Sequence, residues 1–262
     1  MKRILIVIGL SVVLSAMLLT ILLSMFSYYR YPQILPSEWT LHYWMYFLSV
    51  NDLMAEAVLN SIKIGVFTAV LSTTVGFMTG RVVVSHFKSN RNMMMIVYSL
   101  PLFVPATALF IGVHMMMIKF SLNNNFWGIV ISHAIIAIPY STNIAVSFYE
   151  GISIDMENVA KTLGCGPILL FKKILLPLLM PGILLSSAIC FLLSFSEYFA
   201  AFLVGGGKLV TLSTLYYPYI NNGDYGNSAV LSIVFVVVNL SVFAIAEYGT
   251  RKLTRISNYL FE

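Results

Sequence analysis

The chain has 262 residues, of which 59% are hydrophobic and only 10% are charged, and its mean hydropathy is +0.90. A water-soluble domain of this length cannot cover so much apolar surface, so the composition excludes a soluble globular protein and indicates an integral membrane protein. The formal net charge of +5 does not indicate nucleic-acid binding, because the basic residues stand between apolar stretches rather than in one patch.

Six stretches are long and apolar enough to be membrane helices, which need roughly 20 mostly apolar residues. In chain order they are residues 4–26, 59–84, 93–118, 127–148, 174–204 and 228–248. The first follows Lys2 and Arg3 as a signal peptide would, but it is too long for the apolar part of one and has no convincing cleavage site, so we expect it to be retained. The sequence thus predicts one transmembrane domain over residues 1–262, all-α, with six transmembrane helices.

The positions of lysine and arginine predict the orientation of these helices. With the N-terminus inside, the inner segments hold eleven of the 15 Lys and Arg residues, whereas the outer segments hold Arg30, Lys119 and Lys208. Cytoplasmic loops are the ones enriched in Lys and Arg. We therefore expect a multi-pass protein of the bacterial cytoplasmic (inner) membrane with both termini in the cytoplasm.

The longest inner segment, residues 150–173, lies between the fourth and fifth predicted spans. Within it, residues 154–170 have helical character, because Met156, Val159 and Leu163 recur at steps of three and four and form one apolar stripe. The pattern predicts a short cytoplasmic helix outside the membrane.

Two glycines follow the stripe. Gly164 and Gly166 are expected to end or bend the helix, because glycine adopts conformations that other residues resist. Pro177 then marks the entry into the fifth span. Two interpretations of the short helix stay open: it lies on the inner leaflet as an amphipathic helix, or it presents a small apolar surface to a soluble partner.

This loop resembles the cytoplasmic loop of the permease subunits of bacterial ABC importers, whose signature is E-A-A, three residues, Gly, nine residues and I-x-L-P. Here Gly164 and the sequence I-L-L-P have the spacing of that signature, and of the three E-A-A positions only the last matches. The resemblance implies a coupling helix between the fourth and fifth spans that contacts an ATPase. The residues it assigns to that contact are Asn158, Val159, Ala160, Leu163, Gly164, Ile174, Leu176 and Pro177.

Two further segments, FWGIVISHAIIAIPY and LSFSEYFAAFLVGG, look like the polyamine (spermidine/putrescine) type branch of these permeases. This implies ATP-driven import of a polyamine or a similar organic cation. The branch often has two acids in the fifth span, where this chain has Ser196 and Glu197. Phosphonate, sulfate, iron or thiamine are the alternative solutes within the same architecture, and a secondary transporter or a channel is the more remote alternative.

The resemblance also implies the partners. They are a dimer of ABC ATPases, a second permease subunit (a sister or identical chain), an extracellular or periplasmic solute-binding protein and the lipid bilayer, with no nucleic acid. ATP and Mg would bind to the ATPase, and no cofactor would bind to this chain, which is not expected to be an enzyme. The stretch GGGK at residues 205–208 lacks the spacing of a phosphate-binding loop.

Three polar side chains are candidates for the solute pathway. Glu197 is the one acid well inside a predicted span, and a carboxylate in hydrocarbon needs a partner. It is expected to contact a cationic solute with Tyr198, whose ring attracts ammonium groups, or else to form a hydrogen bond or salt bridge between subunits. Lys63 either lines the pathway and favours an anion, or extends its side chain to the interface.

Overall fold

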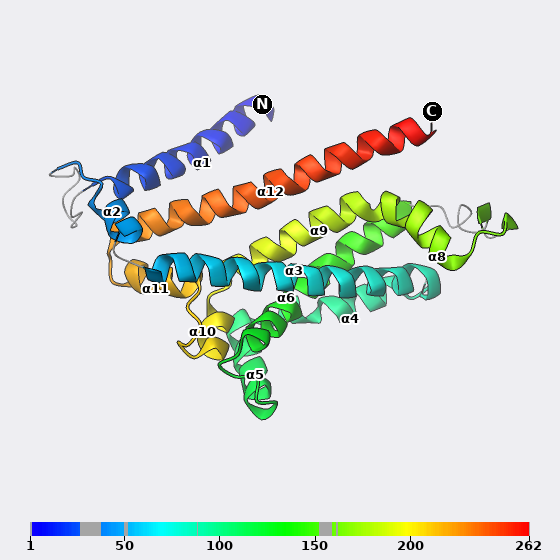
Figure 1. Cartoon of the computed structure of the whole chain (residues 1–262), viewed down its shortest axis with the longest axis horizontal. Coiled ribbons are helices and arrows are strands. Elements are labelled where there is room, and N and C mark those ends of the chain that lie inside the picture. The colour runs from blue at the N-terminus through cyan, green and yellow to red at the C-terminus, as the bar shows by residue number, and fades with distance from the viewer. Residues whose placement is uncertain are drawn as a thin grey trace. The chain divides into compact units, whose positions relative to one another are not determined.

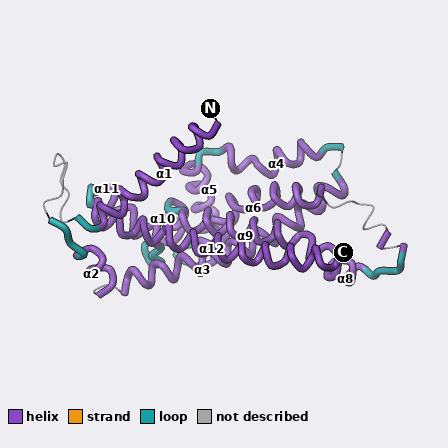
Figure 2. Tube along the Cα trace, turned by 90° about the horizontal axis from the view of Figure 1, so that it is seen from above, coloured by secondary structure: helices purple, strands orange, loops and turns teal. Residues whose placement is uncertain are grey.

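The computed structural model describes residues 2–26, 38–49, 52–87, 89–151, 159–160 and 162–261, with the backbone alone at residues 2–5, 7, 48–49, 52 and 253–261. These residues form helices and short connections and contain no strand, so the all-α prediction is confirmed (Figure 2). The helices are α1 (Lys2–Ser24), α2 (His42–Ser49), α3 (Asp52–His86), α4 (Arg91–Phe103), α5 (Ala106–Lys119), α6 (Phe126–Gly151), α8 (Pro167–Leu170), α9 (Leu176–Ser196), α10 (Phe199–Gly205), α11 (Leu212–Asn221) and α12 (Tyr225–Phe261), with a π-helical turn, Phe171–Leu175, before α9 (Figure 1).

The chain divides into two compact units, of which the first comprises Met1–Asn60 and Val210–Asn239. In this unit aromatic side chains join short helices. The indole Nε1 of Trp44 donates to Ser24 Oγ over 3.2 Å, and the ring of Phe47 packs edge-on against that of Tyr219 with centroids 5.9 Å apart. Aromatic rings with a polar tip contribute apolar contact and a hydrogen bond together, which suits segments at the border of a membrane.

The second unit, Ser61–Leu209 and Leu240–Glu262, contains a close crossing of α3 and α6. A Cβ atom built on Gly76 would lie 2.2 Å from Ser141 Oγ, and one on Gly80 would lie 2.7 Å from the Cβ of Ala145. Both pairs are four residues apart, so they repeat on one face of each helix. Small residues at this spacing let two helix backbones approach closely, which is how helices associate in membranes.

Hydroxyl groups extend this crossing to α9, which runs beside α6 (Figure 1). Ser186 Oγ donates to Ser141 Oγ over 2.8 Å, and Thr73 Oγ1 hydrogen-bonds with the hydroxyls of Ser186 and Ser187 at 3.4 and 3.2 Å. In a membrane such bonds between helices contribute about 0.6 kcal/mol each on average. Helices α3, α6 and α9 therefore form one packed group through small residues and hydroxyls.

The third predicted span, residues 93–118, is broken in the structure. Helix α4 lies beside α6, as Figures 1 and 2 both show, but α5 leaves it at an angle of 91°. Val104 and Pro105 at the corner have extended backbones. Pro105 supplies no N–H to continue the ladder of α4, and its ring disfavours a helical conformation at Val104.

The fifth predicted span, residues 174–204, is also divided. Helix α9 ends at Ser196, and α10 begins at Phe199 after a break at Glu197 and Tyr198. Helix α10 packs on α5 and α6, where Phe110, Ala200 and Val204 belong to one buried apolar cluster with Ile64 of α3. The fifth stretch of high hydropathy is therefore one long helix and one short helix.

Four described helical segments are long and apolar enough to cross a membrane: Leu53–His86, Phe126–Gly151, Pro167–Ser196 and Tyr225–Lys252. The bent pair of α4 and α5 makes a fifth if it counts as one span. In α1 the described apolar part, Ile8–Ser24, is shorter. The structure thus agrees with an all-α membrane protein, and the number of six spans stays a prediction.

Candidate functional site

The loop between α6 and α9 contains a small exposed structure that we call the knob, defined by residues 159–171 without Lys161. Asn158 and the preceding part of the predicted loop helix lie outside the described residues. Val159, Ala160 and Thr162 are helical, and a turn follows at Leu163 and Gly164. The predicted end of the loop helix at the first glycine is confirmed.

Gly164 ends this helix through its backbone conformation. Its φ is +78°, and a Cβ added there would meet no atom within 4 Å, so the requirement for glycine is conformational and not steric. The N–H of Cys165 donates to the C=O of Ala160 over 3.0 Å, across the turn. This bond is the six-residue closure of a Schellman motif, in which a left-handed residue satisfies the last carbonyls of a helix.

The knob exposes apolar side chains and is anchored by others. Leu163 is 82% exposed and Ile168 is 71% exposed, and Val159, Leu169 and Phe171 are exposed as well. Ala160 and Leu170 are buried in a cluster formed with α3, α6 and α9. Exposed apolar patches of this kind mark interaction sites, and here the patch rests on the packed helix group.

The I-x-L-P sequence lies in and after the π-helical turn. Ile174 and Leu176 are half-buried, and Pro177, which has no N–H to donate, is exposed in the first turn of α9 directly after the π-helical turn. The deepest residue is Leu175, the variable position of the motif, which belongs to the same cluster as Leu170. Sequence reasoning missed both leucines, because their spacing of five residues fits a π turn and not an α-helix.

An ion pair lies where this loop leaves the membrane helices. Glu150 stands in the last turn of α6, one residue before its end, and its carboxylate pairs with the guanidinium of Arg91, the first residue of α4. Both side chains are partly exposed, 41% for Arg91 and 35% for Glu150. The pair connects the start of the loop that contains the knob to a helix other than α3 and α9.

Glu197 has a local role that the sequence did not indicate. Its Oε1 accepts hydrogen bonds from the N–H groups of Phe199 and Ala200, at 3.0 and 3.2 Å, and so caps the start of α10. A carboxylate at a helix N-terminus also interacts favourably with the helix dipole. Glu197 is therefore placed at the break between two helices rather than within one.

The other two candidates are Tyr198, directly before α10, and Lys63 on α3. The ring of Tyr198 stacks on Phe202 with centroids 5.6 Å apart and planes at 21°. Lys63 is exposed on α3, next to Ile64, which belongs to the cluster that contains Ala200. Lys63 and Tyr198 are thus each next in sequence to a residue of this cluster or packed against it, Ile64 and Phe199 respectively.

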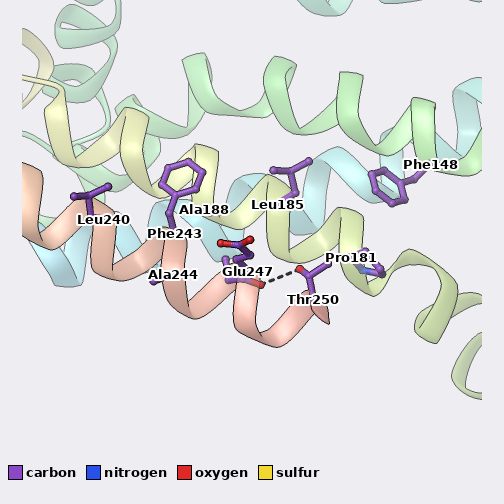
Figure 3. A pocket seen from close by; sticks show the side chains of 10 residues that line it. Phe148, Pro181, Leu185, Ala188, Leu240, Phe243, Ala244, Glu247 and Thr250 are labelled. Atoms are coloured by element: carbon purple, nitrogen blue, oxygen red, sulfur yellow. Dashed lines mark hydrogen bonds between the residues drawn. The ribbon is translucent and has the colours of Figure 1, made fainter. Parts of the chain in front are cut away.

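A groove of about 620 Å³ lies elsewhere in the second unit, between α6, α9 and α12 (Figure 3). Its lining residues are Phe148, Pro181, Leu185, Ala188, Leu240, Phe243, Ala244, Ala246, Glu247 and Thr250. Its one charged lining residue, Glu247, accepts from Arg251 over 2.6 Å on the same helix. Sites for small polar solutes combine apolar walls with several convergent polar groups, so we do not place the solute in this groove.

Comparisons with known proteins agree with this arrangement. The model of a protein family described as "Binding-protein-dependent transport system inner membrane component" matches residues 72–255. A spermidine/putrescine transport system permease protein of Haemophilus influenzae is 26% identical over 213 residues, which are 80% of this chain and 81% of that protein. A protein of Salmonella choleraesuis described as a 2-aminoethylphosphonate transport system permease is 25% identical over 232 residues, 87% of this chain and 83% of that one.

Among solved structures, a bacterial ABC transporter involved in the import of the acidic polysaccharide alginate has a chain similar to this one. The TM-score is 0.68 at 15% identity, covering 96% of this chain and 99% of that chain. At this identity the likeness shows the fold.

Proposed function

The chain belongs to the family of inner membrane components of binding-protein-dependent transport systems, and we propose that this ABC importer permease subunit moves a small organic cation, such as a polyamine, into the cytoplasm. The family is a transport component and not a catalytic one. The energy for transport comes from a separate pair of ATPase subunits, which bind ATP and Mg.

The observation that carries the proposal is the exposed apolar surface of the knob, to which we assign the contact with the ATPase. Its exposed Leu163 and Ile168 form an apolar surface of the size that a groove on a partner accepts, in the manner of a helix bound in a groove. Its buried Ala160 and Leu170 transmit a push to α3, α6 and α9, because packed side chains deform little. Both termini and the knob lie on the cytoplasmic side of the inner membrane, in line with the Lys and Arg distribution.

The solute contacts Glu197 and Tyr198. Both similar permeases described above are named for solutes that contain a primary alkylammonium group, spermidine and putrescine in one case and 2-aminoethylphosphonate in the other. A carboxylate and an aromatic face are the side chains that recognise such a group. Because Glu197 lies at a helix break beside the half-exposed ring of Tyr198, we assign the ammonium contact to these two residues.

A second candidate is an anionic solute. The exposed ammonium of Lys63 favours it, as does the phosphonate in the name of one relative. Transport of sulfate by the same architecture belongs to this alternative, and iron or thiamine are the other solutes that remain as alternatives. A solute-binding protein outside the cell, a second permease subunit and the bilayer complete the assembly in either case.

Copurification tests the proposal. The permease is purified from its native membrane as the wild type and as the Leu163→Asp variant, with Phe120→Asp as a control. Phe120 follows α5, is 61% exposed and lies on the predicted outer side. We expect ATPase subunits with the wild type and the control and none with Leu163→Asp. ATPase binding by all three forms would contradict the assignment of the knob, and the lack of any ATPase with the wild type would favour a secondary transporter or a channel.

A further inference from the structure

The corner between α4 and α5 leaves backbone polar groups unsatisfied within the helices. The first N–H groups of α5, at Ala106, Thr107 and Ala108, have no partner inside that helix, and among the described residues no side chain caps them. The last carbonyl groups of α4 also lack partners inside their helix, because the helix ends at Phe103 and the backbone of Val104 is extended. The corner therefore carries donors and acceptors that need water or another polar partner.

The corner lies at membrane depth. Helix α4 has 13 residues, which is about 20 Å at 1.5 Å per residue. The hydrocarbon core of a bilayer is about 30 Å thick, so a chain that starts at one membrane surface and follows α4 has not yet crossed. Taken together, α4 and α5 have the length and hydropathy of a span.

The corner is also exposed within its unit. Phe103 is 76% exposed, and Val104, Ala106 and Thr107 are exposed as well. Helix α4 has no buried residue. Irregular backbone does not face lipid inside the hydrocarbon region, and is tolerated only where it is buried in protein or lines a water-filled cavity.

A second helix break lies against the same helix. Helix α10 starts at the break after Glu197 and packs on α5, with Ala200 and Phe110 in one cluster. The two breaks differ in one respect: the Glu197 carboxylate accepts from the N–H groups of Phe199 and Ala200 in α10, whereas no described side chain accepts from the first N–H groups of α5. The α5 corner thus depends on water more strongly than the α10 break.

We propose that the corner from Phe103 to Thr107 lines the water-filled solute pathway of the permease. Water in the pathway solvates the backbone groups of the corner, and Phe103 presents its ring to the passing solute. This rests on the proposed function as a transporter. It adds to Glu197 a second wall of the pathway at the α4–α5 corner, and the sequence has no Asp, Glu, Lys or Arg between Arg91 and Lys119.

Thiol labelling tests the proposal. The assembled transporter, lacking Cys165 and Cys190, is made with one cysteine through Phe103→Cys or, in case that variant folds poorly, Thr107→Cys. The control is Ile245→Cys, which is 71% exposed but lies within the unbroken helix α12. The probe is a charged, membrane-impermeant methanethiosulfonate, which reacts with the thiolate that forms only in water.

We expect roughly tenfold faster labelling at the corner than at Ile245→Cys, because a thiol in apolar surroundings stays protonated. Equal rates at all three positions would overturn the proposal. Slow labelling together with disulfide-linked permease pairs from Phe103→Cys would also overturn it, by showing that a second permease covers the corner. ATPase copurification with the same samples is a separate readout, so fast labelling without any ATPase would count against the proposed function and not against the corner.

Discussion

The α3–α6–α9 crossing and the knob use apolar residues in opposite ways. At the crossing, glycine, alanine and serine bring three helices together until an added Cβ atom would collide with a neighbour, as at Gly76. In the knob, large side chains such as Leu163 stand in the open, and a Cβ added at Gly164 would meet nothing. The same residue type, glycine, is required for space in one region and for backbone conformation in the other.

The two regions therefore contribute different properties: the crossing is rigid, and the knob offers a surface for contact with a partner. A packed crossing without room for a methyl group moves as one body, because interiors deform little. An exposed apolar surface gains stability only when a partner covers it. The two regions meet at Ala160, Leu170 and Leu175, which are buried among residues of the membrane helices. Mutations can therefore damage assembly at the crossing and coupling at the knob independently.

The largest effect is expected at the crossing. The Gly76→Leu substitution places a side chain where Ser141 Oγ lies 2.2 Å from the new Cβ and the Ser141 backbone carbon lies 2.9 Å from it. Overpacking costs about 1–3 kcal/mol or more, so we expect a large loss of folded protein in detergent, measured by fluorescence size-exclusion chromatography. The control is Gly112→Leu in α5, where a Cβ meets no atom within 4 Å. Equal yields of the two variants would show that the crossing is looser than described.

The next effect concerns coupling and leaves folding intact. In Gly164→Pro the ring fixes φ near −65°, which is incompatible with the φ of +78° that closes the knob. We expect normal yield in the membrane and loss of solute-stimulated ATP hydrolysis. The matched control is Gly166→Ala, because Gly166 has an extended backbone with φ of −67° and open space around it. If Gly164→Pro hydrolyses ATP as the wild type does, the closure of the knob is not needed for coupling.

A smaller effect distinguishes the roles of Glu197. Glu197→Gln keeps an oxygen that can accept from Phe199 and Ala200 but removes the charge. If the carboxylate contacts a cationic solute, apparent affinity falls by about one to two decades, because a hydrogen bond to a charged group contributes about 1.5–3 kcal/mol. Transport assays with the solute of the cognate binding protein measure this.

Two companion variants complete the experiment on Glu197. Glu197→Ala also removes the cap of α10, for which losses of about 0.5–2 kcal/mol are usual, so its thermal stability is expected to fall below that of Glu197→Gln. Lys63→Met tests the anionic alternative. Normal uptake in Glu197→Gln with a loss in Lys63→Met would be contrary to the cation assignment.

The smallest effect belongs to the ion pair between Arg91 and Glu150. Partly exposed pairs contribute about 0.2–1 kcal/mol, so Arg91→Glu or Glu150→Arg alone should lower thermal stability slightly. The double exchange is expected to restore it. A double-mutant cycle with no coupling between the two positions would show that the pair does not connect α4 to the loop.

Hydropathy and glycine spacing predicted much of the fold. The apolar stretches are helical, although the third and the fifth are each divided, and the loop helix ends at Gly164 as expected, because both features depend on local sequence. The prolines of the apolar stretches behave differently from one another: Pro139 and Pro181 lie within continuous helices, whereas the chain turns by 91° at Val104 and Pro105. A proline alone does not decide between a bend and a straight helix, because neighbouring helices can compensate for the lost hydrogen bond.

The candidate site was predicted in part, for a similar reason. The exposed Val159 and Leu163 followed from periodicity, whereas the capping role of Glu197 depends on a break that hydropathy does not detect. The buried Leu170 and Leu175 depend on the π turn, which changes the residue spacing of a face. Asn158 lies outside the described residues, and its role stays a prediction.

The π-helical turn at Phe171–Leu175 also sets an angle. An α-helix advances about 100° per residue, and a π turn takes up one additional residue. The knob is therefore rotated by about 100° around the helix axis, relative to the position that an uninterrupted α-helix would give it. Without this offset, the side of α8 that holds Leu170 would not face the same neighbours as Leu175 at the end of the turn and Leu179 of α9. The π-helical turn thus sets the rotation of α8 relative to α9. Deleting one residue within it would rotate the knob's apolar surface away from its present direction.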